Sequence, residues 1–506
     1  MPVKILKKAE LVSGREESID EIYFRKNNTP LPTVRISKIV IDGFKSVEHG
    51  EVVLDCGKQF IPHGTQSDIL GIYGQNGSGK TSLIEALAIL KMAMSGISIK
   101  DSCTDCISVK RGFSTLTFTF DLQYPNGEIR TVEYEFSIKK EKMSLEDIML
   151  RQEKRPGPGS DSFDDTSDDD ERNYKICVFN ESLKMSRNNN GKKSRFQTII
   201  QTFGDCEPFG PNKKLQELVG ADKEAKIKLS IHRENLSKDS KSFIFNDKVV
   251  DIIEKCRLSP VYFETLMELR YYAKHYLFVV DTEPSGIIGL KFALPLHTRF
   301  GNFLNSSYQE RMSTKRYDLM SKTFVNISKV LSELVPGLSI KLKKVSDAVM
   351  KDGKPGYIAV PVAYRNGTEI PLRDESDGVR KIISVLNLII TAYNDESTTI
   401  VIDEFDAGIF EYLLGEILLS FEESGKGQLI FTSHNLRPLE IIDKRFLVFT
   451  TANENNRYYR FKDLSSTNNL RDRYFREIVL GGQEEVLYNK TKRFKIESAM
   501  RKAYEE

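Results

Sequence analysis

The sequence predicts an α/β fold built on parallel strands, and three observations indicate it. Short apolar runs at residues 69–73, 399–402 and 428–432 have the continuous hydrophobicity of strands that are covered on both faces. Residues 81–94 follow the first run and carry apolar side chains at helical spacing. Polar or acidic residues stand directly after each run, at the carboxyl ends where parallel sheets bind ligands.

The octapeptide at residues 74–81 predicts a nucleoside triphosphate site between the first of these strands and its helix. Its sequence, Gly-Gln-Asn-Gly-Ser-Gly-Lys-Thr, matches the pattern G-x-x-x-x-G-K-[ST]. In that pattern glycine N–H groups wrap the phosphates, a lysine reaches the β and γ oxygens, and a hydroxyl holds Mg²⁺. The candidate nucleotide-binding residues are Gly74, Gln75, Asn76, Gly77, Ser78, Gly79, Lys80, Thr81 and Ser82.

Two acidic residues, Asp403 and Glu404, follow the apolar run at 399–402. A strand in this position would carry both to the carboxyl edge of the sheet. We therefore expect Asp403 to reach Mg²⁺ and Glu404 to orient or deprotonate the attacking water. The structural alternative is an acid that only caps a helix at a strand end. The next run delivers Ser433 and His434 to the same edge, where an imidazole could contact the γ-phosphate.

Ser376, Asp377 and Gly378 precede an amphipathic helix whose apolar side chains keep helical spacing from Val379 to Ile390. A helix start offers free N–H groups and a favourable dipole to an anion. The structural alternative is an ordinary N-cap and turn before a core helix.

The order of these motifs resembles that of the ABC-type ATPase heads of structural-maintenance, double-strand-break-repair and RecF-like proteins. Residues 36–46, which end in Phe-Lys-Ser, look like the opening strand and turn of such heads. Within this group the chain is most similar to the compact prokaryotic AAA-family ATPases of phage-defence and abortive-infection systems, relatives of the overcoming-lysogenization-defect (OLD) family. The Ser-Asp-Gly signature, the Asp-Glu-Phe-Asp box and residues 468–472 carry this finer likeness. The match covers residues 34–140 and 340–482.

The resemblance implies an ABC-ATPase-like P-loop NTPase head with an antiparallel β side sheet and a mainly helical insertion. It also implies ATP and Mg²⁺ as cofactors. Lys80 would bind the phosphates, while Thr81 and Asp403 would hold the magnesium. The catalytic residues would be Glu404, as the carboxylate, and His434, as the γ-phosphate sensor.

In the same heads a signature helix acts in trans. Ser376, Asp377 and Gly378 would contact the ATP of a second subunit, so that ATP joins two heads into a homodimer or higher oligomer. Asp406 would stand in the D-loop, although its Asp-Ala-Gly-Ile sequence is not the usual one. The glutamine loop is not placed, because Gln123 suits a hairpin strand better than a magnesium contact.

We therefore expect an ATPase that assembles around ATP and acts as a sensor or regulator in an antiphage defence system. It would control a separate effector protein, such as a nuclease or a toxin. One alternative is a RecF-like repair ATPase that clamps duplex DNA. A second is an assembly scaffold that binds ATP with little turnover.

Composition shifts along the chain predict its organisation. A hairpin turn is expected at residues 125–127, between two alternating strands. The expected segments are an N-terminal tail or strap (1–33), the first half of the head (34–142), a low-complexity or loop region (143–210), a mainly helical insertion (211–340), the second half of the head (341–482) and a basic C-terminal helix (483–506).

Length and composition set bounds on function. The 506 residues, 40% of them hydrophobic, can form a large core. Lys and Arg total 74 against 72 Asp and Glu, which excludes a strongly basic nucleic-acid-coating protein but leaves nucleic acid possible through a local patch. The sequence has neither a long apolar run nor a secretory signal, so we expect a cytoplasmic protein with no membrane partner.

Three weaker patterns have simpler interpretations. Cys103 and Cys106 form a lone C-x-x-C, which we interpret as two loop thiols because structural zinc normally needs four ligands. Arg270 and His275 have the spacing found in some helical ribonucleases, which we interpret instead as a helix face packed with tyrosines. The basic stretch at 184–195 is interpreted as a solvated loop, with a nucleic-acid contact as the alternative.

Overall fold

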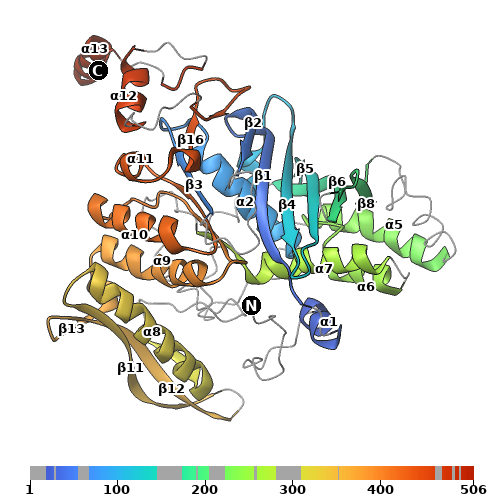
Figure 1. Cartoon of the computed structure of the whole chain (residues 1–506), viewed down its shortest axis with the longest axis horizontal. Helices are drawn as coiled ribbons and strands as arrows, with labels where there is room; N and C mark the ends of the chain where they lie inside the picture. The colour runs from blue at the N-terminus through green and yellow to red at the C-terminus, as the bar shows by residue number, and fades with distance from the viewer. Residues whose placement is uncertain are drawn as a thin grey trace.

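The computed structural model describes residues 19–27, 30–54, 68–144, 174–189, 192–203, 223–255, 259–280, 309–350, 353–461, 470–480, 485–488 and 492–505. Within these residues the chain forms three sheets, and the central one is covered by helices (Figure 1). The α/β class and the antiparallel side sheet expected from the sequence are confirmed.

The central sheet has six strands in the order β17–β16–β3–β15–β14–β9, and its pairs are parallel except for β16 with β17. β3, β14 and β15 are buried at every position, which is why their sequences are apolar without alternation. The strands are β3 Asp68–Tyr73, β9 Leu277–Val280, β14 Thr399–Ile402, β15 Gln428–Thr432, β16 Leu447–Thr450 and β17 Tyr458–Tyr459.

Alternate residues of β3 reach two different hydrophobic cores. Leu70 and Ile72 belong to the core that contains helix α2 (Lys80–Met94). Ile69 and Tyr73 belong to the core that contains α9 (Asp377–Asn394) and α10 (Glu411–Ser424), which lie one above the other in Figure 1. The sheet is therefore packed on both faces, and its carboxyl edge remains for a ligand.

The side sheet has seven antiparallel strands, in the order β2–β1–β4–β5–β6–β7 with β8 paired to β6. The expected hairpin is present: Gln123 pairs with Ile129 across a turn in which Gly127 has a left-handed φ of 85°. The strands are β1 Thr33–Phe44, β2 Val47–Val53, β4 Phe113–Gln123, β5 Ile129–Lys142, β6 Tyr174–Asn189, β7 Lys192–Lys193 and β8 Gln197–Gln201.

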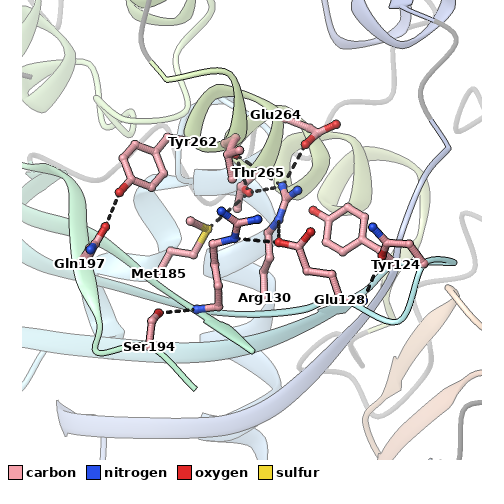
Figure 2. A network of polar contacts seen from close by, with 12 residues as sticks. Tyr124, Glu128, Arg130, Met185, Ser194, Gln197, Tyr262, Glu264 and Thr265 are labelled. Atoms are coloured by element: carbon pink, nitrogen blue, oxygen red, sulfur yellow. Dashed lines mark hydrogen bonds and ion pairs between the residues drawn. The ribbon is translucent and has the colours of Figure 1, made fainter. Parts of the chain in front are cut away.

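Helices cover one face of the side sheet and share its core with α2. Arg130 of β5 reaches the helix above it and donates to Glu264 and Thr265 at 3.0 Å each (Figure 2). These helices are α1 Ile19–Asn27, α5 Lys223–Lys238, α6 Asp247–Lys255 and α7 Pro260–His275, and the 3₁₀ turn η2 Asp101–Cys106 lies beside them.

The expectation of a loop region at 143–210 is wrong for most of its described part. β6 is one of the long strands of the side sheet, and Lys184, which opens the expected basic loop, lies inside it opposite Glu133. Ile176, Val178 and Leu183 are buried on the inner side of β6, while polar residues hide this alternation in the sequence. Within the expected loop region, the low-complexity acidic stretch at residues 155–171, interpreted from the sequence as a loop, lies outside the described residues.

The expectation of a mainly helical insertion at 211–340 misses a strand of the central sheet. β9 follows α7 directly and pairs in parallel with β14, Leu277 opposite Thr399. Four residues are too few for a periodicity signal, and the pairing is distant in sequence. Arg270, one of the two residues of the ribonuclease-like spacing, is completely buried, and its guanidinium contacts Asp20 and Asp247. It therefore packs α1 and α6 against α7 and is inaccessible to a substrate.

A third sheet leads into the signature helix. Its order is β10–β12–β11 with β13 paired to β12, and helix α8 packs on it. A hairpin at residues 365–368 joins β12 to β13, with left-handed φ values of 49° at Asn366 and 86° at Gly367. The elements are β10 Glu310–Ser313, α8 Thr314–Leu334, β11 Leu338–Val349, β12 Pro355–Arg365, β13 Thr368–Pro371 and the 3₁₀ turn η3 Leu372–Asp374.

Short elements complete the C-terminal part of the chain. They are α11 Pro438–Ile441, the 3₁₀ turn η4 Lys444–Phe446, α12 Leu470–Leu480 and α13 Arg493–Glu505. A search of the described helices found none with the length and apolar character that a membrane span requires.

Candidate nucleotide-binding site

The P-loop joins β3 to α2 in the conformation that the motif requires. Gly77 and Gly79 have left-handed φ values of 74° and 95°, which non-glycine side chains rarely adopt. Gly74 has no room for a side chain, because a Cβ there would lie 1.7 Å from the hydroxyl of Thr450. Ser78 closes the turn by donating from its hydroxyl to the carbonyl of Gln75 at 2.5 Å. The loop is therefore a fixed cradle of backbone N–H groups.

The side chain of Lys80 folds back over the P-loop. Its Nζ donates to the carbonyls of Gly74 at 2.9 Å and Gln75 at 3.1 Å, and only 6% of the residue is exposed. Burial lowers the pKa of Lys80, and the nearby carboxylates of Asp403, Glu404 and Asp406 act in the opposite direction. The ammonium is thus held between the loop and the acidic edge of the sheet, where the β and γ phosphates of a nucleotide would lie.

Asp403 and Glu404 follow β14 at the carboxyl edge of the sheet, next to the end of β15. Asp403 is 3% exposed, and its Oδ1 accepts a hydrogen bond from the hydroxyl of Thr432. The same threonine oxygen accepts the N–H of Glu404 at 2.7 Å. Glu404 has a φ of 44°, a left-handed conformation that costs on the order of 1–3 kcal/mol in a non-glycine residue. Such strain persists only where the surroundings hold it, which is common at functional sites.

Asp406 connects the loop that follows β14 to the loop that carries His434 through hydrogen bonds. Its Oδ2 accepts the backbone N–H groups of His434 at 3.0 Å and Asn435 at 2.8 Å, while the imidazole itself is exposed. The D-loop assignment of Asp406 stays a prediction, and these two hydrogen bonds give the residue a structural task within its own chain.

The signature residues lie at the start of α9. Ser376 caps the helix, because its Oγ accepts the N–H of Val379 at 3.4 Å, as the N-cap alternative expected. A Cβ on Gly378 would lie 1.9 Å from the carbonyl of Gly408, so the helix start packs directly on the loop that follows Glu404. The in-trans assignment of Ser376, Asp377 and Gly378 stays a prediction.

A cavity of about 370 Å³ opens beside the P-loop. It brings P-loop residues and the loop after β15 together with aromatic residues from the C-terminal part of the chain, which sequence reasoning missed. No residue of the signature lines it. The lining residues are Tyr73, Gly74, Gln75, Asn76, Ser433, His434, Leu436, Tyr474, Ile478 and Tyr488.

Arg457 and Tyr458, at the start of β17, contribute two further contacts that the sequence did not predict. The hydroxyl of Tyr458 donates to the carbonyl of Gly79 at 2.8 Å. The guanidinium of Arg457 donates to the carbonyls of Thr451, at 2.6 Å, and Ser46. These contacts hold the Phe-Lys-Ser turn against the P-loop, and only the fold brings the three segments together.

The donor set at this edge fits magnesium. Thr81 is exposed at the start of α2, and Asp403 supplies a carboxylate, so both offer the oxygen ligands that Mg²⁺ prefers. Sites of this kind use one or two protein ligands and complete the shell with phosphates and water. The described residues contain no cluster of three metal-binding side chains. Ser82, the last candidate nucleotide-binding residue, is buried in the first turn of α2.

Comparison with known proteins identifies a family. A family model described as an AAA ATPase domain matches residues 35–437, most of the chain. No match was found among the curated proteins.

Solved structures of head domains also match over most of their length. One is an Smc head domain with an extended coiled coil, bound to the C-terminal domain of ScpA, from Pyrococcus furiosus (13% identity, 85% of this chain, 96% of that chain, TM-score 0.36). Another is an SMC head domain from Thermotoga maritima (13% identity, 85% and 100%, TM-score 0.33). A third is the recombination mediator RecF with ATP (14% identity, 79% and 94%, TM-score 0.32). Similarity at this level carries no argument about function.

Proposed function

Because this chain belongs to the AAA ATPase domain family, we propose that it hydrolyses ATP at the edge formed by the P-loop and Asp403–Glu404, with each nucleotide enclosed between two copies. The observation that carries this proposal is the convergence at one sheet edge. Lys80, Asp403, Glu404 and the loop of His434 come from three different strands of the central sheet and meet there.

The residues divide the work of phosphoryl transfer to water. The P-loop N–H groups and Lys80 bind the phosphates and offset the charge that builds up on them. Magnesium, held through Thr81 and Asp403, supplies further charge neutralisation when bound. Glu404 accepts a hydrogen bond from the attacking water and orients it towards the γ-phosphate. His434, in the loop after β15 at the same edge, senses the γ-phosphate.

The second copy enters through the signature helix. The start of α9 offers helix N–H groups to an anion, yet residues 376–378 are absent from the lining of the cavity beside the P-loop. A partner chain would bring its own helix start to the phosphates. ATP would then hold two heads together, and hydrolysis would release them.

Glu404→Gln tests the catalytic assignment. The variant keeps the size of the side chain and removes the carboxylate, so nucleotide binding should persist while steady-state turnover falls roughly a hundredfold or more. Glu416→Gln, an exposed acid on α10, is the matched control and should cycle as the parent does. Turnover by Glu404→Gln at the parental rate would remove Glu404 from the mechanism.

For the cellular role we propose a sensor or regulator in an antiphage defence system that controls a separate effector. The support is the sequence resemblance in the Ser-Asp-Gly signature and the Asp-Glu-Phe-Asp box. Mass spectrometry of proteins that co-purify with the native chain, with and without ATP, tests it. An effector subunit that joins only in one nucleotide state is the expected result. Salt-sensitive duplex binding that stimulates hydrolysis, without an effector, would instead favour the RecF-like alternative.

A further inference from the structure

Lys381 links the signature helix to the catalytic loop of the same chain. It lies in the second turn of α9 and is only 4% exposed. Its Nζ donates a hydrogen bond to the backbone carbonyl of Glu404. That carbonyl also accepts the N–H of Ala407 at 2.9 Å, within its own turn, so Lys381 supplies a contact from a separate element.

This lysine is surrounded by the acids of the site. Burial lowers the pKa of Lys381, and Asp406, Glu404 and Asp403 act in the opposite direction. A charged group is buried at a cost unless it is hydrogen-bonded and close to opposite charge, and both conditions hold here. Lys80 approaches the same three carboxylates from the P-loop. The two lysines therefore face one acidic cluster, one from the nucleotide loop and the other from the signature helix.

The contact lies where the backbone is strained. Glu404 has a left-handed φ of 44°, and the side chain of Thr432 fixes its N–H from the β15 side. Lys381 fixes its carbonyl from the α9 side. A conformation of this kind needs such contacts on both sides to persist, because it costs energy in a residue other than glycine.

We propose that Lys381 is a positioning residue that couples the two nucleotide sites of the dimer, by connecting the helix start that faces the partner's ATP to the peptide of Glu404 in its own site. This inference rests on the proposed function. Ser376 and Lys381 are five residues apart, about 7.5 Å along a rigid helix axis. A nucleotide that draws the start of α9 towards the partner therefore moves the Lys381 contact too, and the packing of Gly378 on Gly408 transmits the same shift. Binding of ATP at one site thus determines the position of the Glu404 carboxylate at the other site.

Lys381→Met tests the positioning role. It removes the hydrogen bond and keeps the length of the side chain, so kcat should fall roughly tenfold or more while ATP affinity stays within about twofold. Lys381→Arg retains a cation and hydrogen-bond donors, so it should recover part of the lost kcat. This variant also provides a test if Lys381→Met folds poorly. Lys91→Met is the matched control, because burial lowers the pKa of Lys91 as well and this residue lies over the ring of Phe278, on α2 and away from Glu404.

Mixed dimers test the coupling. Two differently tagged chains are paired, and one of them carries Lys80→Ala so that it holds no ATP. The loss of that nucleotide should slow hydrolysis by an intact partner severalfold, and it should have no further effect on a Lys381→Met partner. A merely structural lysine would give two independent losses that multiply.

The outcomes separate this inference from the proposed function. If Glu404→Gln stays monomeric with ATP, both are wrong. If Glu404→Gln dimerises with ATP but Lys381→Met cycles within about twofold of the parent, or if the two losses multiply in the mixed dimers, only the coupling through Lys381 is wrong.

Discussion

The nucleotide site and the polar network on the side sheet both bury charged groups, and they differ in what those groups contact. In the network, Arg130 donates to the carboxylates of Glu128 and Glu264 at 3.0 Å each, and α7 covers it (Figure 2). In the site, Lys80 donates to backbone carbonyls and makes no ion pair with a described residue. Its charge is close to three carboxylates but is not neutralised by direct contact.

This difference separates stability from function. The ion pairs of Arg130 hold α7 against β5. At the sheet edge the cation and the acids are held apart by the backbone, next to a strained peptide and a cavity. Buried charge alone therefore does not distinguish the candidate site from the network, whereas separated charges beside a strained backbone do.

Lys80→Ala should have the largest effect. It removes the cation that faces the β and γ phosphates, so binding of Mg-ATP should be lost in an equilibrium fluorescence titration. The free energy of unfolding should change little, because the ammonium donates only to two backbone carbonyls, and water can donate to them in its place. Normal ATP affinity in this variant would show that the charge at the sheet edge is structural, as in the network.

Arg130→Met should lower the stability of the protein and leave ATP binding unchanged, the reverse of Lys80→Ala. Glu128 and Glu264 would lose their buried partner, and breaking such a pair costs about 3–5 kcal/mol. The variant should therefore unfold at a markedly lower denaturant concentration than the parent, with unchanged ATP affinity where it is folded.

Lys184→Met is the control for this variant on the same sheet. Its ion pair with Glu133 is partly exposed, with 32% and 29% of the two side chains accessible, so its removal should cost less than about 1 kcal/mol. Equal destabilisation by the two variants would mean that the network of Arg130 adds nothing beyond a surface pair.

Glu268→Gln should change how the stability of the protein depends on pH. Burial raises the pKa of Glu268 well above its usual range, although the hydrogen bond from Tyr124 and the charge of Arg130 act in the opposite direction. The folded state therefore keeps a proton that the unfolded chain releases above about pH 4.3, and stability is lost as pH rises from there towards the folded pKa. Glutamine cannot ionise, so the variant should lack this decline of up to about 1.4 kcal/mol per pH unit. Denaturation midpoints at pH 5 and pH 8 measure it, and an identical pH dependence in both proteins would contradict a protonated Glu268.

The sequence predicted those parts of the site that follow one another along the chain. β3, the P-loop and α2 are consecutive in the sequence. The glycines at 77 and 79 indicate the left-handed backbone of the loop between them. The apolar runs before Asp403 and Ser433 identified two further strands, since buried parallel strands carry little else.

The sequence did not predict the contacts between distant segments. Lys381 gave no signal as the partner of the Glu404 carbonyl, because a lysine on an amphipathic helix normally faces solvent. Tyr474 and Tyr488 reach the cavity only through the packing of the C-terminal part. The strands β6 and β9 were missed for similar reasons: one has a charged outer face, and the other is only four residues long.

Light scattering of the Glu404→Gln protein on a sizing column tests the central idea most directly. With saturating Mg-ATP its mass should double from the 57.8 kDa of one chain, and addition of Lys80→Ala to the same protein should abolish the shift. A strictly monomeric Glu404→Gln protein with ATP bound would contradict the enclosure of the nucleotide between two copies.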